Sequence, residues 1–325
     1  MNLKTTYLGL PLKNPFVIGV SPFCDNLTVC RELVSAGAAA IVMHSFFEEQ
    51  VEAKSRALRH SPSTEIDRVT FPAYEDYRLD SEQYLRQLSR LRQLVEVPII
   101  ASLNGHNVGN WAGQAQRMED AGAAGIELNL YHVAADPSVP ADEIESSMLQ
   151  LVRTVSAFVK VPVAVKILSS HTSPVHFAAM LNENGAAGLV VFNRFYQADI
   201  DPQTMQTVPR LRLSDSSDLL LRLRWLSILS PEFPGALACS GGVHTGKDAV
   251  KAVLAGADVV QVVSALLKRG APHVETMITE FKAWMAGKEY RSVDQFRGAL
   301  DMRRCIDPGS HERADYLQAL QAWRV

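Results

Sequence analysis

A glycine pair in the last third of the chain has the composition of an anion-binding turn. Gly241 and Gly242 follow an apolar stretch typical of a strand, and a helical pattern begins a few residues later. Glycine lacks a Cβ, so the backbone there can approach an anion closely and point N–H groups at it. The next apolar stretch ends at the small hydroxyl residue Ser264. This order predicts a phosphate site, and an ordinary strand-to-helix turn is the alternative.

The elements that must position these residues alternate along the chain. Apolar runs typical of buried parallel strands are separated by helical patterns, which indicates a sheet covered on both faces. The expected strands are Phe16–Gly19, Ala39–Met43, Ile99–Leu103, Gly125–Leu130, Pro162–Ile167, Gly188–Phe192, Leu237–Ser240 and Val259–Val263. The expected helices are Leu27–Ser35, Glu82–Val95, Ala112–Ala121, Asp142–Val159, Val175–Asn184, Leu219–Leu229, Lys247–Leu254 and His273–Ala286.

Eight such units predict an α/β fold, the (β/α)₈ TIM barrel, in which functional groups lie at the C-terminal ends of the strands. A doubly wound sheet competes, but the chain lacks the Gly-x-Gly-x-x-Gly turn of that fold. Residues 5–14 predict a small N-terminal hairpin that closes the bottom of the barrel. Long loops are expected after the second strand, at Phe46–Tyr77, and after the sixth, at Asn193–Asp218. No domain boundary is evident, so we expect one domain over residues 1–325.

Composition excludes several classes of function. The chain is 47% hydrophobic and 21% charged, with a net charge of -3 and no long runs of like charge, so neither nucleic acid nor an anionic membrane is an expected partner. No stretch has the roughly 18 apolar residues of a membrane span, and we expect a cytoplasmic protein. The four scattered cysteines and the spacing of the nine histidines predict no disulfide framework, iron–sulfur cluster or metal site.

An ordered set of motifs resembles the dihydroorotate dehydrogenase family, the FMN barrels of pyrimidine synthesis. The matching segments are Leu12–Phe16, Ser21–Cys24, Ile126–Leu130, Val163–Lys166 and, in the manner of the soluble class 1 branch, Tyr290–Gly298. No single motif is diagnostic, whereas their common order over nearly the whole chain is specific.

The resemblance implies a set of ligand contacts. Lys166 matches the lysine whose charge faces the pyrimidine edge of the flavin; a surface lysine is the alternative. Asn129 and Asn193 match asparagines that bind cofactor or substrate, since an amide both donates and accepts. The other cofactor positions are Ser21 near the flavin ring and Gly241, Gly242 and Ser264 at the FMN phosphate. Asn104, at the end of the third strand, is expected to contact cofactor or substrate.

Several positions depart from the family pattern. Where the family has a cysteine or serine that removes a proton from the substrate, this chain has His132, with Tyr131 as a second candidate. An imidazole with a pKa of about 6.5 is a competent base at neutral pH, whereas a phenol near 10 is mostly protonated. His44 replaces the family lysine at the end of the second strand, and we expect it to contact the cofactor.

The substrate contacts are also fewer. Two family asparagines are missing, one at Ala134 and one in Asp67–Phe71, and Leu213–Ser216 stands in place of a Gly-Gly loop. A site built from hydrogen bonds discriminates strongly between ligands, so these losses predict retained FMN binding with an altered substrate or substrate pose.

We therefore expect an FMN-dependent oxidoreductase that acts on a CH–CH bond of dihydroorotate or a related dihydropyrimidine. Family analogy favours a homodimer, and fumarate, NAD through a partner subunit or quinone remain open as electron acceptors. Two alternatives are a flavin-binding barrel without dehydrogenase activity and a phosphate-binding aldolase or isomerase in which Lys166 forms a Schiff base.

Overall fold

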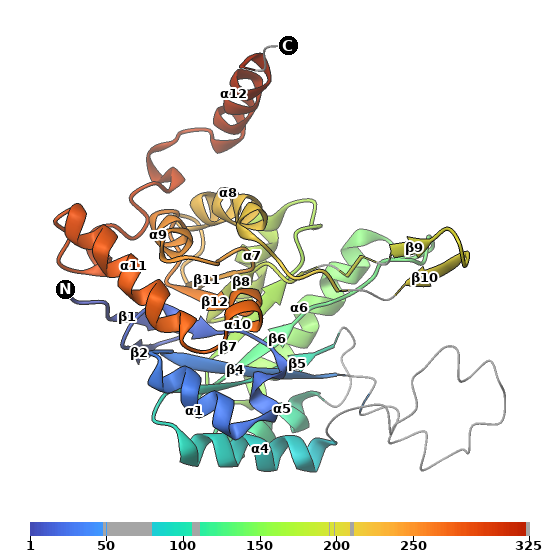
Figure 1. The fold of residues 1–325 in the computed structure, drawn as a ribbon. Helices are drawn as coiled ribbons and strands as arrows, with labels where there is room; N and C mark the ends of the chain where they lie inside the picture. The colour runs from blue at the N-terminus through green and yellow to red at the C-terminus, as the bar shows by residue number, and fades with distance from the viewer. Residues whose placement is uncertain are drawn as a thin grey trace.

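Eight parallel strands close into a barrel surrounded by helices (Figure 1). The computed structural model describes residues 1–47, 50, 80–105, 111–194, 196–197, 199–208 and 211–322. Neighbouring strands follow the order β11-β12-β3-β4-β5-β6-β7-β8. The barrel strands are β3 (Phe16–Ile18), β4 (Ala40–Phe47), β5 (Ile99–Asn104), β6 (Gly125–Asn129), β7 (Val163–Ile167), β8 (Gly188–Val191), β11 (Ala236–Ser240) and β12 (Val259–Val262). The predicted (β/α)₈ fold is confirmed.

The surrounding helices lie close to their predicted positions. They are α1 (Leu27–Ser35), α4 (Ser81–Leu94), α5 (Trp111–Asp120), α6 (Ala141–Phe158), α7 (Pro174–Glu183), α8 (Leu219–Leu229), α9 (Gly246–Leu254) and α11 (His273–Gly287). Two further helices, α10 (Ser264–Arg269) and α12 (Pro308–Gln321), were not expected. Aspartate and asparagine side chains begin several of them; Asp80, for example, accepts a hydrogen bond from Gln83 N at 2.7 Å.

The core has two layers because alternate residues of each strand face opposite sides of the sheet. Val17, Val42, Ile100, Ala164 and Val190 belong to the cluster inside the barrel, whereas their neighbours in the chain pack against the helices. Polar residues replace the apolar ones toward the C-terminal ends of the strands. The barrel therefore has a packed apolar lower part and a polar upper part.

The N-terminal hairpin closes the lower end, as predicted. β1 (Thr5–Tyr7) pairs with β2 (Leu10–Leu12), and Leu8 lies between them against the barrel floor. A Cβ at Gly188 would lie 2.5 Å from Leu8 Cδ2, so the glycine makes room for the plug. In Figure 1 this hairpin lies on the left and the strands end toward the right.

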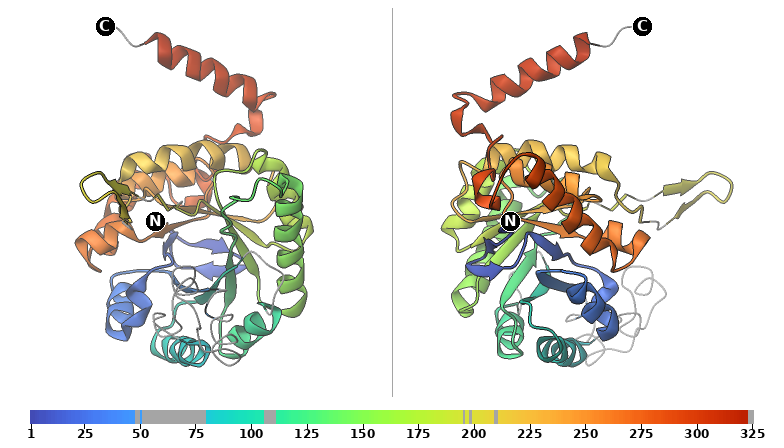
Figure 2. Two further views of the ribbon diagram at one scale, coloured as in Figure 1. Left: turned by 90° about the vertical axis from the view of Figure 1, so that its right-hand side faces the viewer. Right: turned by 60° about the vertical axis from the view of Figure 1, so that its left-hand side comes forward.

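The two expected long loops have different outcomes. The segment Phe46–Tyr77 lies mostly outside the described residues, and its first two residues extend β4 instead. Within Asn193–Asp218 the strands β9 (Asp199–Asp201) and β10 (Gln206–Val208) form an antiparallel hairpin. This hairpin projects from the body of the barrel (Figure 2).

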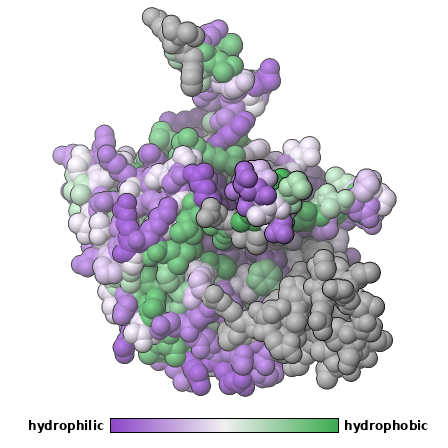
Figure 3. Space-filling view, turned by 45° about the vertical axis from the view of Figure 1, so that its right-hand side comes forward, coloured by the Kyte–Doolittle hydropathy of each residue, from purple (hydrophilic) through white to green (hydrophobic). Residues whose placement is uncertain are grey.

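Helix α12 stands clear of the barrel at the opposite side of the molecule from α1 and α4 (Figures 1 and 3). None of its described residues is buried. Arg224 Nε on α8 contacts Glu312 Oε2 on α12 at 2.9 Å. None of the helices in the described ranges is long and apolar enough to cross a membrane.

Candidate functional site

Three of the predicted polar residues lie together at the C-terminal ends of neighbouring strands. Asn104 of β5 is in register with Asn129 of β6, which is in register with Lys166 of β7. Asn193, which follows β8, donates from Nδ2 to Asn129 Oδ1 at 2.9 Å. Asn129 and Lys166 are buried, and Asn104 and Asn193 are half-buried. The upper end of the barrel thus presents amide donors and acceptors next to a cation.

Lys166 has partners that the sequence did not predict. Its Nζ lies 3.3 Å from Glu127 Oε1 and 3.5 Å from Gln261 Oε1. Gln261 Nε2 in turn donates to Glu127 Oε2 at 2.5 Å. All three side chains are buried, so Lys166 is an interior cation and the surface alternative is wrong. A signal was available: Glu127 and Gln261 are polar residues within otherwise apolar strands.

The two candidate bases follow β6 in an irregular segment. Tyr131 and His132 are both half-buried. The Tyr131 hydroxyl oxygen accepts a hydrogen bond from Tyr196 N at 3.0 Å, which joins this segment to the one after β8. The roles of Tyr131 and His132 in proton transfer stay predictions.

A bulge in β4 determines where His44 lies. The pairing of β4 with β5 shifts register between Val42 and Ser45, so that Ser45 Oγ lies 2.8 Å from Ser102 Oγ. His44 instead places Nδ1 3.2 Å from Asp25 Oδ1, and its ring packs edge-on against Tyr84 of α4 at 5.1 Å. A bulge redirects side chains in this way because it adds one residue to one strand of a pair. His44 thus contacts Asp25 and Tyr84, and its predicted cofactor contact stays untested.

The glycine pair has the geometry of a tight anion-binding turn. Gly241 and Gly242 have φ values of +95° and +82°, which favour glycine. A Cβ at Gly242 would lie 2.3 Å from Leu219 N at the start of α8. A Cβ at Gly241 would lie 3.0 Å from Arg222 Nη2. Only glycine fits this close approach, and a buried guanidinium lies beside it.

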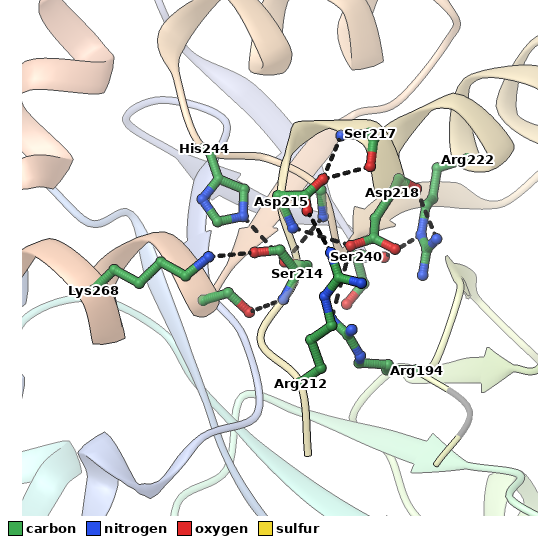
Figure 4. A network of polar contacts seen from close by, with 12 residues as sticks. Arg194, Arg212, Ser214, Asp215, Ser217, Asp218, Arg222, Ser240, His244 and Lys268 are labelled. Atoms are coloured by element: carbon green, nitrogen blue, oxygen red, sulfur yellow. Dashed lines mark hydrogen bonds and ion pairs between the residues drawn. The ribbon is translucent and has the colours of Figure 1, made fainter. Parts of the chain in front are cut away.

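Ser214, from the segment before α8, lies at the centre of the polar groups around this turn (Figure 4). Its Oγ lies 3.1 Å from His244 Nε2, and its N donates to Ser264 Oγ at 3.2 Å. Lys268 Nζ donates to Ser214 O at 2.8 Å, and Gly242 N lies 3.5 Å from Ser214 Oγ. The predicted residues Gly242 and Ser264 are thus brought together through Ser214. Burial and then the charge of Lys268 lower the pKa of His244.

These residues fit a flavin mononucleotide. The glycine pair packs closely against Arg222 and the start of α8, and hydroxyl, ammonium and guanidinium groups lie around it, a donor set that suits a phosphate. The Ser21 hydroxyl, at the end of β3, is buried and has no hydrogen-bond partner among the described residues. An additional polar ligand would satisfy it.

One expectation falls on residues that are not described, the missing asparagine in the segment Asp67–Phe71. Within the described part of the chain, no group of three or more His, Cys, Asp or Glu side chains is arranged to hold a metal ion.

The chain is similar in sequence to several known dehydrogenases. A family model described as dihydroorotate dehydrogenase matches residues 230–285, which include the glycine pair, β12 and α10. The chain is 24% identical to the chloroplastic dihydropyrimidine dehydrogenase (NADP(+)) of Arabidopsis thaliana, over 91% of this chain and 76% of that protein. It is 28% identical to the dihydroorotate dehydrogenase (fumarate) of Saccharomyces cerevisiae, over 92% and 98%. It is also 29% identical to a putative dihydroorotate dehydrogenase A (fumarate) of Aeropyrum pernix, over 67% and 70%.

The family match covers Gly241, Gly242 and Ser264, and the pairwise similarities extend over most of the chain at low identity. The departures at positions 44 and 132 lie within this similar region. Over most of its length the chain is therefore similar to dihydroorotate dehydrogenases, from which it diverges widely in sequence.

Proposed function

We propose that the protein is an FMN-dependent oxidoreductase that acts on a CH–CH bond of dihydroorotate or a related dihydropyrimidine. The observation that supports this most is the Asn193–Asn129 hydrogen bond beside Lys166 at the C-terminal ends of the strands. Relatives named as dihydroorotate and dihydropyrimidine dehydrogenases point to the same class of substrate.

The chain's residues divide into three groups in this proposal. Gly241, Gly242 and Ser264 hold the phosphate of FMN. Gly242 N and Ser264 Oγ, which contact Ser214 in this structure, would then bind the phosphate. Ser21 and Lys166 face the flavin ring. FMN, when bound, supplies the acceptor for a hydride. The amides of Asn129 and Asn193 hold the ring of the substrate, since each can donate and accept.

A side chain after β6 accepts the proton that leaves the substrate. His132 is the first candidate because a neutral imidazole accepts a proton near pH 7. Tyr131 is the second, and its hydroxyl oxygen already accepts a hydrogen bond from Tyr196 N. Both follow Asn129 closely in the chain, so either lies near the amides that would orient the substrate.

The first test is an anaerobic titration of the purified protein with dihydroorotate, and in parallel with dihydrouracil, while the visible flavin absorbance is recorded. Bleaching of the flavin by either compound is the expected result, and the compound that bleaches it identifies the ring. A protein that purifies with FMN but is reduced by neither would favour the flavin-binding alternative. A protein with no affinity for FMN would contradict the proposal.

The aldolase alternative has less support. A Schiff-base lysine must present its amine to a carbonyl carbon, whereas Lys166 Nζ is engaged by Glu127 and Gln261 inside the barrel. Borohydride trapping with a carbonyl substrate tests this alternative directly.

We also propose a homodimer, from the resemblance, and a cytoplasmic location, from the composition of the chain. Light scattering of the purified protein tests the first, and fractionation of cells that produce it tests the second.

A further inference from the structure

A buried carboxylate lies directly below the candidate site. Glu127 is fully buried in β6, and it precedes Asn129 by two residues, so both side chains face the barrel interior. The Tyr7 hydroxyl is buried nearby without a hydrogen-bond partner among the described residues. Burial, followed by the charges of Glu127 and Asp258, raises the pKa of Tyr7 well above its usual value. Glu127 thus lies in a low-dielectric region where an ionised carboxylate needs specific partners.

The side-chain polar atoms of Glu127, Lys166 and Gln261 all have partners within this set of three residues. Glu127 Oε1 accepts from Lys166 Nζ at 3.3 Å, and Glu127 Oε2 accepts from Gln261 Nε2 at 2.5 Å. The Gln261 carbonyl oxygen lies 3.5 Å from the same Nζ. The three contacts form a closed ring, so moving any one side chain breaks contacts of the other two. Such closure is what makes a buried ion pair tolerable.

The ring of contacts crosses the barrel. β6 and β7 are neighbours, whereas β12 is separated from β6 by β3, β4 and β5 in the strand order. Lys166 is therefore held from two sides of the barrel wall. These contacts restrict the rotamers of its long side chain. A fixed cation contributes more to an electrostatic site than a mobile one because it needs no reorganisation.

We propose that Glu127 and Gln261 are positioning residues that fix the Lys166 ammonium below the ligand ring and offset its charge. This inference rests on the proposed function for the identity of the ring, but the hold on Lys166 is a property of the chain itself. The flavin would meet a cation of set position whose field is reduced by the carboxylate behind it.

The first test does not depend on any ligand. Glu127→Gln leaves a buried ammonium without its counter-charge, so the unfolding equilibrium constant from urea titrations should rise by about 100-fold. In the Lys166→Met background the same substitution should change it by less than about tenfold, because the partner is gone. The double substitution Glu127→Gln and Gln261→Glu moves the carboxylate from β6 to β12 while keeping it beside Lys166, and it should restore most of the stability. Equal effects of Glu127→Gln in both backgrounds would overturn the proposal.

The second test measures the two-electron midpoint potential of bound FMN. Glu127→Gln should raise it, since an unbalanced Lys166 charge stabilises the anionic reduced flavin. A tenfold change in the ratio of affinities for reduced and oxidised flavin corresponds to about 30 mV, and we expect at least that rise. The swapped pair should bring the potential back toward that of the parent protein, which a merely structural role would not do. An unchanged potential in Glu127→Gln would refute the electrostatic part.

The two measurements distinguish a failure of the proposed function from a failure of the positioning role of Glu127 and Gln261. If the protein binds no FMN, the proposed function is contradicted, and the urea titrations still decide whether Glu127 and Gln261 hold Lys166. If FMN binds and the titrations show no coupling, the positioning role is wrong while the proposed function stands.

Discussion

At the scale of single residues, the chemistry depends on which side chain takes the proton. His132 follows the buried end of β6 by three residues, in a segment joined to the loop after β8 by the Tyr131–Tyr196 contact. An ordinary imidazole is largely neutral above about pH 6.5 and can accept a proton there. We therefore expect the histidine to take the place of the cysteine or serine base that the resemblance implies.

The replacement His132→Ala should lower the rate of flavin reduction by about 10²–10⁴-fold, which is the usual contribution of a general base. The measurement is anaerobic stopped-flow absorbance at saturating substrate. His176→Ala, on the exposed side of α7, is the matched control and should leave the rate unchanged. If His132→Ala also leaves it unchanged, Tyr131→Phe becomes the informative variant.

The two asparagines should act as a pair. Asn193→Ala leaves the Asn129 carbonyl oxygen without its donor, and an unsatisfied buried group costs about 1–3 kcal/mol. We expect KM for the reduced substrate to rise by about 5- to 150-fold with a smaller change in kcat. Asn182→Ala on α7 serves as the control. A variant with normal KM would remove Asn193 from substrate binding.

At the scale of elements, the turn between β11 and α9 is the most constrained part of the site. Gly242→Ala introduces a Cβ 2.3 Å from Leu219 N at a positive φ, so the turn must distort. Loss of FMN retention is the expected outcome, measured as flavin content after gel filtration. Gly287→Ala is the control, because its Cβ would meet no atom within 4 Å. Full flavin content in Gly242→Ala would show that the phosphate lies elsewhere.

His244 should make stability depend on pH. Burial lowers its pKa, so near the ordinary imidazole value the unfolded chain binds more protons than the folded one. The contribution of the neutral ring is present above that value and is lost as pH falls below it. Urea midpoints should therefore drop between about pH 7.5 and pH 5.5, and His244→Gln should make this drop smaller. An identical drop in the variant would assign the pH dependence to other groups.

At the scale of the whole molecule, we expect the barrel to be stable without α12. Its described residues are all at least partly exposed, and a partly exposed pair such as Arg224–Glu312 contributes about 0–1 kcal/mol. A chain ending at Asp307 should therefore keep its unfolding free energy within about 1 kcal/mol. Urea titration of the shortened and full chains tests this. A larger loss would mean that α12 packs against a surface not evident in a single copy of the chain.

The barrel itself follows from local pattern. Alternating helical and strand periods predicted seven of the eight barrel strands within one residue, because burial on both faces of a parallel strand imposes apolar residues throughout. The second strand, expected to end at Met43, continues as β4 to Phe47. The glycine pair was predicted for a similar reason: positive φ and close approach admit few other residues. Helix α12 was missed because it buries no apolar face that would impose a period.

Side-chain partnerships were decided by the tertiary structure alone. Glu127, Lys166 and Gln261 are separated by 39, 95 and 134 residues along the chain, and only closure of the barrel brings β6 and β12 to face each other. The register shift in β4 likewise turns His44 toward Asp25 and Tyr84, whereas strict alternation would point it inward. The sequence by itself determined the alternating strands and helices of the barrel and the glycine pair after β11, because burial and backbone conformation restrict which residues can stand there. Which side chains meet depended on strand register and barrel closure, since a shift of one residue reverses the side of the sheet that a residue faces.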